Sequence, residues 1–185
     1  DGVASLHFAP DALLTACPRG STAMSDTAAT RSAEGSGGSP GGSGKPVRWG
    51  ILGTGFIAGL QTSDLVGHGF SVQAVGSREP ARAREFAAGF QLQSSHGSYA
   101  ALVTDPAVDV VYIASPHPFH YEHALLALNA GKHVLVEKPF AMNAWQARAV
   151  VDLAESSGLV ALEAMWTRYL PHMVRIRELI RSGAL

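Results

Sequence analysis

The residues with the clearest chemical meaning form a glycine-rich turn, Gly53-Thr54-Gly55-Phe56-Ile57-Ala58, which matches the pattern G-x-G-x-x-G/A. In this pattern the first glycine permits a tight turn, the second lets the backbone approach a pyrophosphate, and the small residue at 58 keeps a helix close to a strand. The pyrophosphate then faces free N–H groups at the positive end of that helix. The turn predicts a dinucleotide site. A glycine turn with a purely structural role is the alternative.

The residues after the next apolar run indicate which dinucleotide is bound. An NAD enzyme usually places an acid there to hold the ribose 2′-hydroxyl, whereas here the run leads into Ser77-Arg78 and the first acid is Glu79. Arg78 offers a planar guanidinium for a 2′-phosphate, with Arg82 one helical turn later and Ser77 as a hydroxyl donor. The pattern favours NADP over NAD, against the alternative that the arginines form only a solvated helix face.

Three histidines at a spacing of three occur within residues 115–123. On a helix His120 and His123 would share a face, so a metal site is one interpretation. Two prolines, however, hold His117 in a turn ahead of the helix, and neither cysteine nor further acidic ligands lie nearby in the sequence. Because α/β sheets bind ligands at turns that follow parallel strands, we expect no metal and expect His117 to face the cofactor.

Glu137-Lys138-Pro139 also follows an apolar run directly, which would bring Lys138 to the same crevice. An ammonium group there can lower the pKa of a substrate hydroxyl or orient that hydroxyl for loss of a hydride. Because surface lysines are common, the motif alone does not establish this role.

Alternating strands and helices must position these residues. Apolar patterns predict strands over 47–52, 71–76, 108–114, 133–136 and 159–163, and helices over 56–66, 80–89, 99–103, 119–130, from Asn143 to just before Gly158, and from Pro171 onward. The run 108–114 is apolar almost throughout, as expected of a strand buried on both faces of a parallel sheet. This alternation predicts an α/β fold with a Rossmann-type doubly wound parallel sheet.

Composition narrows the class of protein. The chain has 185 residues, of which 46% are hydrophobic and 16% charged, and a formal net charge of -1. That length suits one domain with appendages. The balanced charge, without a Lys/Arg run, argues against binding to nucleic acid or to a membrane surface, and no apolar run is long enough to span a bilayer. A single cysteine, Cys17, cannot form an internal disulfide, so a cytoplasmic location is the default expectation.

Residues 1–45 have the composition of a flexible leader. From Thr27 to Gly44 the chain is almost entirely Ala, Ser, Gly, Thr and Pro, which offers nothing to bury. Met24 is a hypothetical true start of translation. The segment ending at Cys17 resembles a lipoprotein cleavage box, but it lacks a basic region and Asp11 interrupts its apolar stretch, so we prefer the leader interpretation.

The order of the motifs resembles the Gfo/Idh/MocA family of oxidoreductases (glucose–fructose oxidoreductase, inositol dehydrogenase and rhizopine catabolism proteins). The resemblance covers about residues 47–185 and is carried by the glycine turn, Ala74–Arg78, Ser115–His120, Ala130–Val134 and Glu137–Pro139. The segment Glu163–Pro171 looks most like the branch that contains dimeric dihydrodiol dehydrogenase and xylose dehydrogenase.

The resemblance implies an NAD(P)-dependent dehydrogenase of a sugar, polyol or trans-diol; a non-catalytic NAD(P)-sensing module is the alternative. It implies that Lys138 is catalytic and is followed by a cis peptide bond, that Arg78 and Arg82 meet the NADP 2′-phosphate, and that Trp166 and Arg168 lie near the substrate. The cofactor-binding residues that we expect are Gly53, Thr54, Gly55, Phe56, Ile57, Ser77, Arg78, Arg82, Ser115, Pro116, His117, His120, Glu137 and Lys138.

Members of this family continue with a second α+β domain that carries the other catalytic group and usually mediates oligomerisation. We therefore expect residues 46–168 to form the Rossmann domain and residues 169–185 to begin the connection to a C-terminal domain that is missing from this sequence. On this view the chain is the N-terminal half of a homo-oligomeric enzyme and is inactive by itself. Its last helix would leave an apolar stripe uncovered, formed by Met173, Ile176, Leu179 and Ile180.

Overall fold

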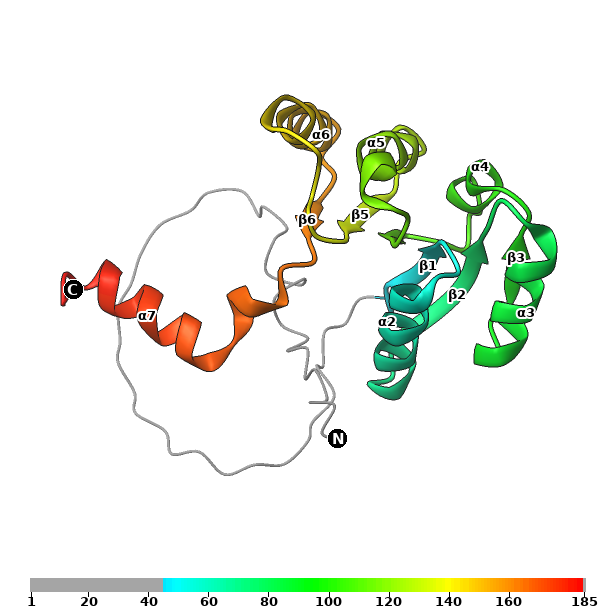
Figure 1. Cartoon of the computed structure of the whole chain (residues 1–185), viewed down its shortest axis with the longest axis horizontal. Helices are drawn as coiled ribbons and strands as arrows, with labels where there is room; N and C mark the ends of the chain where they lie inside the picture. The colour runs from blue at the N-terminus through cyan, green and yellow to red at the C-terminus, as the bar shows by residue number, and fades with distance from the viewer. Residues whose placement is uncertain (1–44, 185) are drawn as a thin grey trace.

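A computed structural model describes residues 45–184 of the chain, and its centre is a six-stranded parallel sheet (Figure 1). The strands are β1 (Arg48–Leu52), β2 (Ser71–Gly76), β3 (Ser94–His96), β4 (Val110–Ile113), β5 (His133–Val136) and β6 (Ala161–Glu163), in the order β3-β2-β1-β4-β5-β6. This is the Rossmann-type doubly wound sheet that the sequence predicts. The expected leader, with Cys17 and Met24, lies outside the described residues apart from Lys45.

Helices cover both faces of the sheet. They are α2 (Phe56–Gly67), α3 (Pro80–Phe90), α4 (Tyr99–Val103), α5 (His120–Asn129), α6 (Ala144–Ser156) and α7 (Pro171–Arg181), with short 3-10 turns η1 (His117–Phe119) and η2 (Trp166–Tyr169). Figure 1 shows α2 and α3 on one face and α4, α5 and α6 on the other. Each layer encloses its own core, because the side chains of a buried parallel strand alternate between the two faces. Ile51 and Tyr112 pack toward α2 and α3, whereas Leu52 and Ile113 pack toward the other three helices.

Local signals place most of the helix ends correctly. Pro80 is the first residue of α3, and the Asn143 side chain caps α6 by accepting a hydrogen bond from Gln146 N at 2.9 Å. Gly131 and Gly158 end α5 and α6 with φ of 75° and 66°, a left-handed conformation that glycine adopts without strain.

Two expectations are corrected. Helix α3 does not stop at Gly89 but ends at Phe90, and Gln91, which caps it, adopts φ of 56°. Strand β3, Ser94–His96, has no counterpart among the predicted strands. Its three residues are polar, so the strand forms because the edge of β2 offers backbone hydrogen-bonding groups rather than because of its own side chains.

Helix α7 points away from the sheet (Figure 1), and none of its residues is buried. In the predicted apolar stripe, Ile176 and Ile180 are 40% and 58% exposed, and Met173 and Leu179 are half-buried. Within residues 45–184, no helix combines the length and the apolar character needed to cross a bilayer.

An ion pair that the sequence did not reveal holds the amino edge of the sheet. The Arg48 guanidinium at the start of β1 donates through Nε and Nη2 to the two carboxylate oxygens of Asp109, at 2.9 and 2.7 Å, and Arg48 N donates to the same carboxylate. Asp109 directly precedes β4, the neighbour of β1. These bonds from Arg48 lower the pKa of Asp109 below its ordinary value, against the smaller opposing effect of burial.

We expect that in Asp109→Asn the free energy of unfolding decreases less steeply as the pH falls than it does in the wild type. Because the folded-state pKa of Asp109 is lowered, its ionised form stabilises the fold above the unfolded value near 3.8, and that contribution is lost as the pH falls below 3.8. Urea unfolding at pH 7, 5 and 3 should show a smaller loss of stability in the variant than in the wild type. Asp152→Asn, at an exposed position of α6, should leave the slope unchanged; equal slopes for all three proteins would contradict the assignment.

Candidate dinucleotide-binding and active site

The strand order reverses between β1 and β4, and the crevice beyond their carboxyl ends is where doubly wound sheets bind ligands. The chain leaves β1 at Gly53, whose N–H donates to the Gly76 carbonyl oxygen of β2 at 2.9 Å. Gly53 has φ of 113°, and a Cβ there would lie 3.1 Å from the Ala114 carbonyl oxygen. Both the backbone conformation and the close approach of β4 therefore require glycine at this position.

Gly55, in contrast, is not required by packing within the protein. It has extended backbone angles, φ of -80° and ψ of 179°, and a Cβ there would meet no atom of the described residues within 4 Å. It precedes α2, which no side chain of the described residues caps, and Phe56 beside it is 82% exposed. The first N–H groups of α2 therefore have no side-chain acceptor among the described residues, the condition under which a helix N-terminus can bind a pyrophosphate.

Arg78 and Arg82 follow β2 at the same edge of the sheet. Ser77 is buried and its Oγ accepts a hydrogen bond from Glu79 N at 3.2 Å. Arg82 Nε lies 3.0 Å from a Glu79 carboxylate oxygen, whereas Arg78 is exposed and forms no ion pair within residues 45–184. Within the described residues, the Arg78 guanidinium at this edge is therefore free and the Arg82 guanidinium is bound only to Glu79, so both can bind a phosphate ester.

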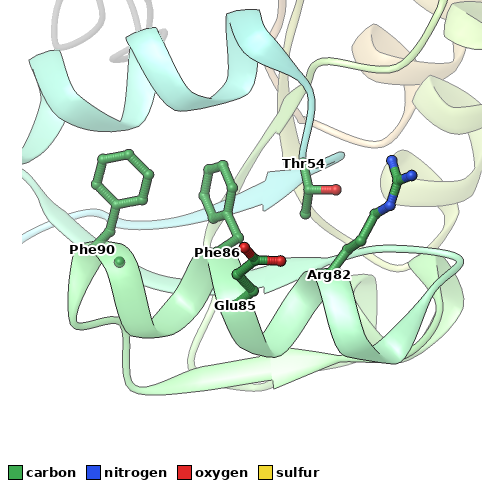
Figure 2. Close-up of a pocket in the computed structure, with 6 residues that line it drawn as sticks. Thr54, Arg82, Glu85, Phe86 and Phe90 are labelled. Carbon is green, nitrogen blue, oxygen red and sulfur yellow. The ribbon is translucent and has the colours of Figure 1, made fainter.

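Arg82 also lies at one end of a groove of about 530 Å³ (Figure 2). Thr54 from the glycine turn stands opposite Arg82, and Phe86 and Phe90 of α3 line the other end. The groove is open to solvent and begins where the glycine turn and α3 face each other, so a phosphate held by Arg82 would also lie near Thr54.

A smaller pocket of about 200 Å³ lies beside Arg78. Its walls are Arg78, Tyr99, Pro116, Phe119, Glu122 and His123. The His123 ring stacks on Phe119 at 5.9 Å between centroids, and its Nδ1 lies 2.8 Å from Ser115 Oγ. Burial lowers the pKa of His123, so this ring is neutral near pH 7. Flat, uncharged aromatic walls beside a guanidinium suit a purine base.

The histidines at 117 and 120 differ in their exposure to solvent. His117 is exposed on η1, next to the pocket, whereas His120 is fully buried. The two ring nitrogens of His120 each lie 2.8 Å from a backbone oxygen, Nδ1 from Pro139 and Nε2 from Ser115. His120 therefore ties the loop after β4 to the turn after β5. Within the described part of the chain, no three His, Cys, Asp or Glu side chains gather closely enough to hold a metal ion.

The Glu137-Lys138-Pro139 turn is held from several sides. The Lys138–Pro139 peptide bond is cis, which confirms what the resemblance implied. The Tyr112 hydroxyl donates to Glu137 Oε1 at 2.5 Å, Lys138 N donates to Glu137 Oε2 at 3.0 Å, and Phe140 N donates to Glu163 Oε1 at 2.8 Å. Burial, followed by the Glu137 carboxylate, raises the pKa of Tyr112 above its ordinary value, so its hydroxyl stays protonated and donates.

Lys138 is exposed, and within residues 45–184 no carboxylate oxygen lies within 4 Å of its Nζ. Trp166 and Arg168 lie on η2, which follows β6 beyond the same carboxyl edge of the sheet, and both are exposed. Sequence reasoning missed Tyr112 and Glu163. A tyrosine in an otherwise aliphatic strand was the available signal for Tyr112, because a buried hydroxyl needs a partner.

The fold and this crevice define a dinucleotide-binding Rossmann domain: an uncapped helix after a glycine turn, a phosphate-binding edge after β2, and a lysine after β5 at one end of the sheet. A family profile described as an oxidoreductase family with an NAD-binding Rossmann fold matches residues 47–164. The chain belongs to this family, Gfo/Idh/MocA.

Two curated proteins that are similar to the chain are named as dehydrogenases. The chain is 42% identical over 159 residues to D-xylose 1-dehydrogenase (NADP(+)) of Hypocrea jecorina, and 43% identical over 142 residues to trans-1,2-dihydrobenzene-1,2-diol dehydrogenase of Mus musculus. These alignments cover 77% and 75% of the chain but 40% and 43% of the relatives. The chain therefore spans about two fifths of the length of these curated relatives.

A solved structure with the same arrangement is a 3-ketoreductase from Actinomadura kijaniata in complex with NADP and TDP-benzene. It is 32% identical with a TM-score of 0.66, and the match covers 76% of this chain and 44% of the other. An NAD-binding oxidoreductase from Klebsiella pneumoniae matches at 30% identity with a TM-score of 0.67, over 75% of this chain and 39% of the other.

Proposed function

We propose that the chain is the NADP-binding domain of a dehydrogenase that oxidises a carbinol carbon of a sugar, polyol or trans-diol. The observation that carries the proposal is the presence, at one edge of the sheet, of three features that have no partner among residues 45–184: the N–H groups after Gly55, the Arg78 guanidinium and the Lys138 ammonium. Support comes from relatives named as xylose and dihydrodiol dehydrogenases and from a neighbour solved with NADP.

Each group has a distinct role in this proposal. The helix N–H groups after Gly55 bind the pyrophosphate, Ser77, Arg78 and Arg82 bind the 2′-phosphate, and the pocket beside Tyr99 takes the adenine. NADP, when bound, supplies the hydride acceptor. Lys138 hydrogen-bonds the substrate hydroxyl and assists removal of its proton, and Trp166 and Arg168 contact the substrate.

The proposed function is tested in two stages. Calorimetric titration of the 185-residue chain with NADP, NAD and 2′,5′-ADP tests binding, and we expect NADP to bind more tightly than NAD. A panel of aldoses, polyols and trans-diols with NADP then tests turnover by the complete enzyme, followed as formation of NADPH. Absence of NADP binding would overturn the proposal. Binding without turnover of any of these classes would favour a nucleotide-sensing module instead.

Replacing Arg78 by alanine should weaken NADP binding selectively. A charge-assisted bond to the 2′-phosphate contributes roughly 1.5–3 kcal/mol, so the Kd for NADP should rise about 10- to 150-fold. The Kd for NAD should change less than threefold, because NAD lacks this phosphate. Arg84→Ala removes another exposed arginine, which lies on α3 and outside both pockets, and is the matched control. Equal losses of NADP and NAD affinity in Arg78→Ala would show that Arg78 does not read the phosphate.

The same proposal covers the wider organisation of the protein. Residues 46–168 form the dinucleotide-binding domain, and residues 169–185, which contain α7, lead toward a second domain that supplies the other catalytic group. The complete enzyme is a cytoplasmic homo-oligomer. Support for this organisation is the share of the relatives' length that the chain covers and the exposed apolar stripe of α7.

A further inference from the structure

Lys138 and Glu137 are adjacent in sequence and opposite in charge, yet their side chains do not pair. Both follow β5, and the Lys138 ammonium has no carboxylate partner among residues 45–184. An ion pair between exposed side chains contributes little, so a stronger partner for either group can prevent it. The structure gives the carboxylate such a partner.

Both oxygens of the Glu137 carboxylate accept a hydrogen bond. Oε1 accepts the Tyr112 hydroxyl at 2.5 Å and Oε2 accepts Lys138 N at 3.0 Å. The second bond is local and accompanies the turn. The first bond joins two strands and is the shorter one, as expected when a hydroxyl donates to an ionised carboxylate.

Tyr112 is well placed to hold this carboxylate. Its side chain is fully buried against β1, α2 and α3, so its hydroxyl has little freedom to move. In the β4–β5 register Tyr112 lies beside Leu135, and because side chains alternate along a strand, Glu137 emerges on the face of Leu135. The register therefore brings the hydroxyl and the carboxylate together.

We propose that Tyr112 is a positioning residue that keeps the Glu137 carboxylate away from Lys138 and so leaves the Lys138 ammonium free for a ligand in the crevice. Without the hydroxyl, the carboxylate loses its buried donor and turns to Lys138, the cation adjacent to it in the sequence. The ammonium is then neutralised by its neighbour and drawn out of the crevice.

The first experiment measures the accessibility of the Lys138 amine in the 185-residue chain. Limited acetylation with acetic anhydride, followed by mass spectrometry, gives the rate at Lys138 relative to exposed Lys45 as an internal reference. In Tyr112→Phe we expect this ratio to fall about 3- to 10-fold. Tyr112→Phe/Glu137→Gln should restore the ratio, because an uncharged amide does not hold an ammonium. An unchanged ratio in Tyr112→Phe, or no recovery in the double variant, would overturn the proposal.

Two further variants guard against a general effect on folding. Tyr121→Phe removes a hydroxyl that makes no hydrogen bond within residues 45–184 and should leave the ratio unchanged. Glu137→Gln alone keeps an acceptor for Tyr112 and should also leave the ratio unchanged, since the wild-type carboxylate does not pair with Lys138. Faster acetylation in Glu137→Gln would show that the pair already exists and would overturn the proposal even if Tyr112→Phe failed to fold.

The second experiment rests on the proposed function and uses the complete enzyme. Tyr112→Phe should lower kcat about 10-fold with little change in the KM for NADP, and Glu137→Gln in that background should recover part of the loss. A variant whose only defect is structural would not be rescued by a second substitution. Because acetylation needs no cofactor and no turnover, failure of the proposed function leaves the first experiment decisive for Tyr112.

Discussion

Replacing Lys138 by methionine will lower kcat of the complete enzyme by about 10²- to 10⁴-fold, the usual contribution of a positioned proton-transfer group. Methionine keeps an unbranched side chain and removes the ammonium. In the Glu-Lys-Pro turn the Glu137 carboxylate is bound to Tyr112 and to the backbone, so Lys138 carries the only free ionisable group. Steady-state kinetics and calorimetry should show the loss in kcat while the Kd for NADP stays within about threefold.

Lys132 offers a matched control six positions earlier in the chain. Its Nζ donates to the carbonyl oxygens of Asp105 and Val108 at 2.9 and 2.7 Å, in the loop that leads into β4 at the opposite edge of the sheet. Lys132→Met should therefore lower thermal stability and leave kcat within twofold. Retention of more than a tenth of the wild-type kcat by Lys138→Met, or equal kinetic effects at both lysines, would remove Lys138 from the proposed catalytic role.

The parts of the site that sequence reasoning found are those encoded over a few neighbouring residues. The glycine turn, Ser77-Arg78 and Glu137-Lys138-Pro139 each follow a strand directly, so their place at the carboxyl edge follows from the fold class alone. His120 shows the limit of this reasoning. The sequence groups it with His117, but His117 is exposed on η1, whereas His120, three residues later at the start of α5, is buried and bound to two backbone oxygens.

Contacts that depend on strand register were not predicted. Tyr112 and Glu137 are 25 residues apart, and their hydrogen bond exists only because Tyr112 aligns with Leu135. The Arg48–Asp109 pair spans 61 residues and likewise depends on β1 lying beside β4. Strand β3 was not predicted for a related reason: its backbone pairing with β2, rather than its own side chains, makes it a strand. Apolar periodicity identifies elements, whereas register decides which polar side chains meet.

The two glycines of the phosphate-binding turn should respond differently to substitution, and Gly55→Val carries the larger effect on binding. A valine side chain there fills the space in front of the first N–H groups of α2, where no atom of the described residues lies within 4 Å of the added Cβ. Losing at least two charge-assisted bonds to the pyrophosphate, at roughly 1.5–3 kcal/mol each, weakens binding by about 3–6 kcal/mol. Calorimetry should therefore show a rise in the Kd for NADP of about 10²- to 10⁴-fold.

Gly55→Val should nevertheless stay folded. Gly55 is then a glycine that ligand binding requires, in contrast to Gly53, which the fold requires. Its φ of -80° and ψ of 179° suit valine, so the cost is the loss of a better helix cap, about 1 kcal/mol at most. Gly53→Val should instead lower the free energy of unfolding by several times as much, because φ is 113° and the Ala114 carbonyl lies 3.1 Å from the new Cβ. Gly67→Val, at the far end of α2 with equally open surroundings, should bind NADP like the wild type. Wild-type affinity in a folded Gly55→Val variant would mean that the pyrophosphate does not lie against this turn.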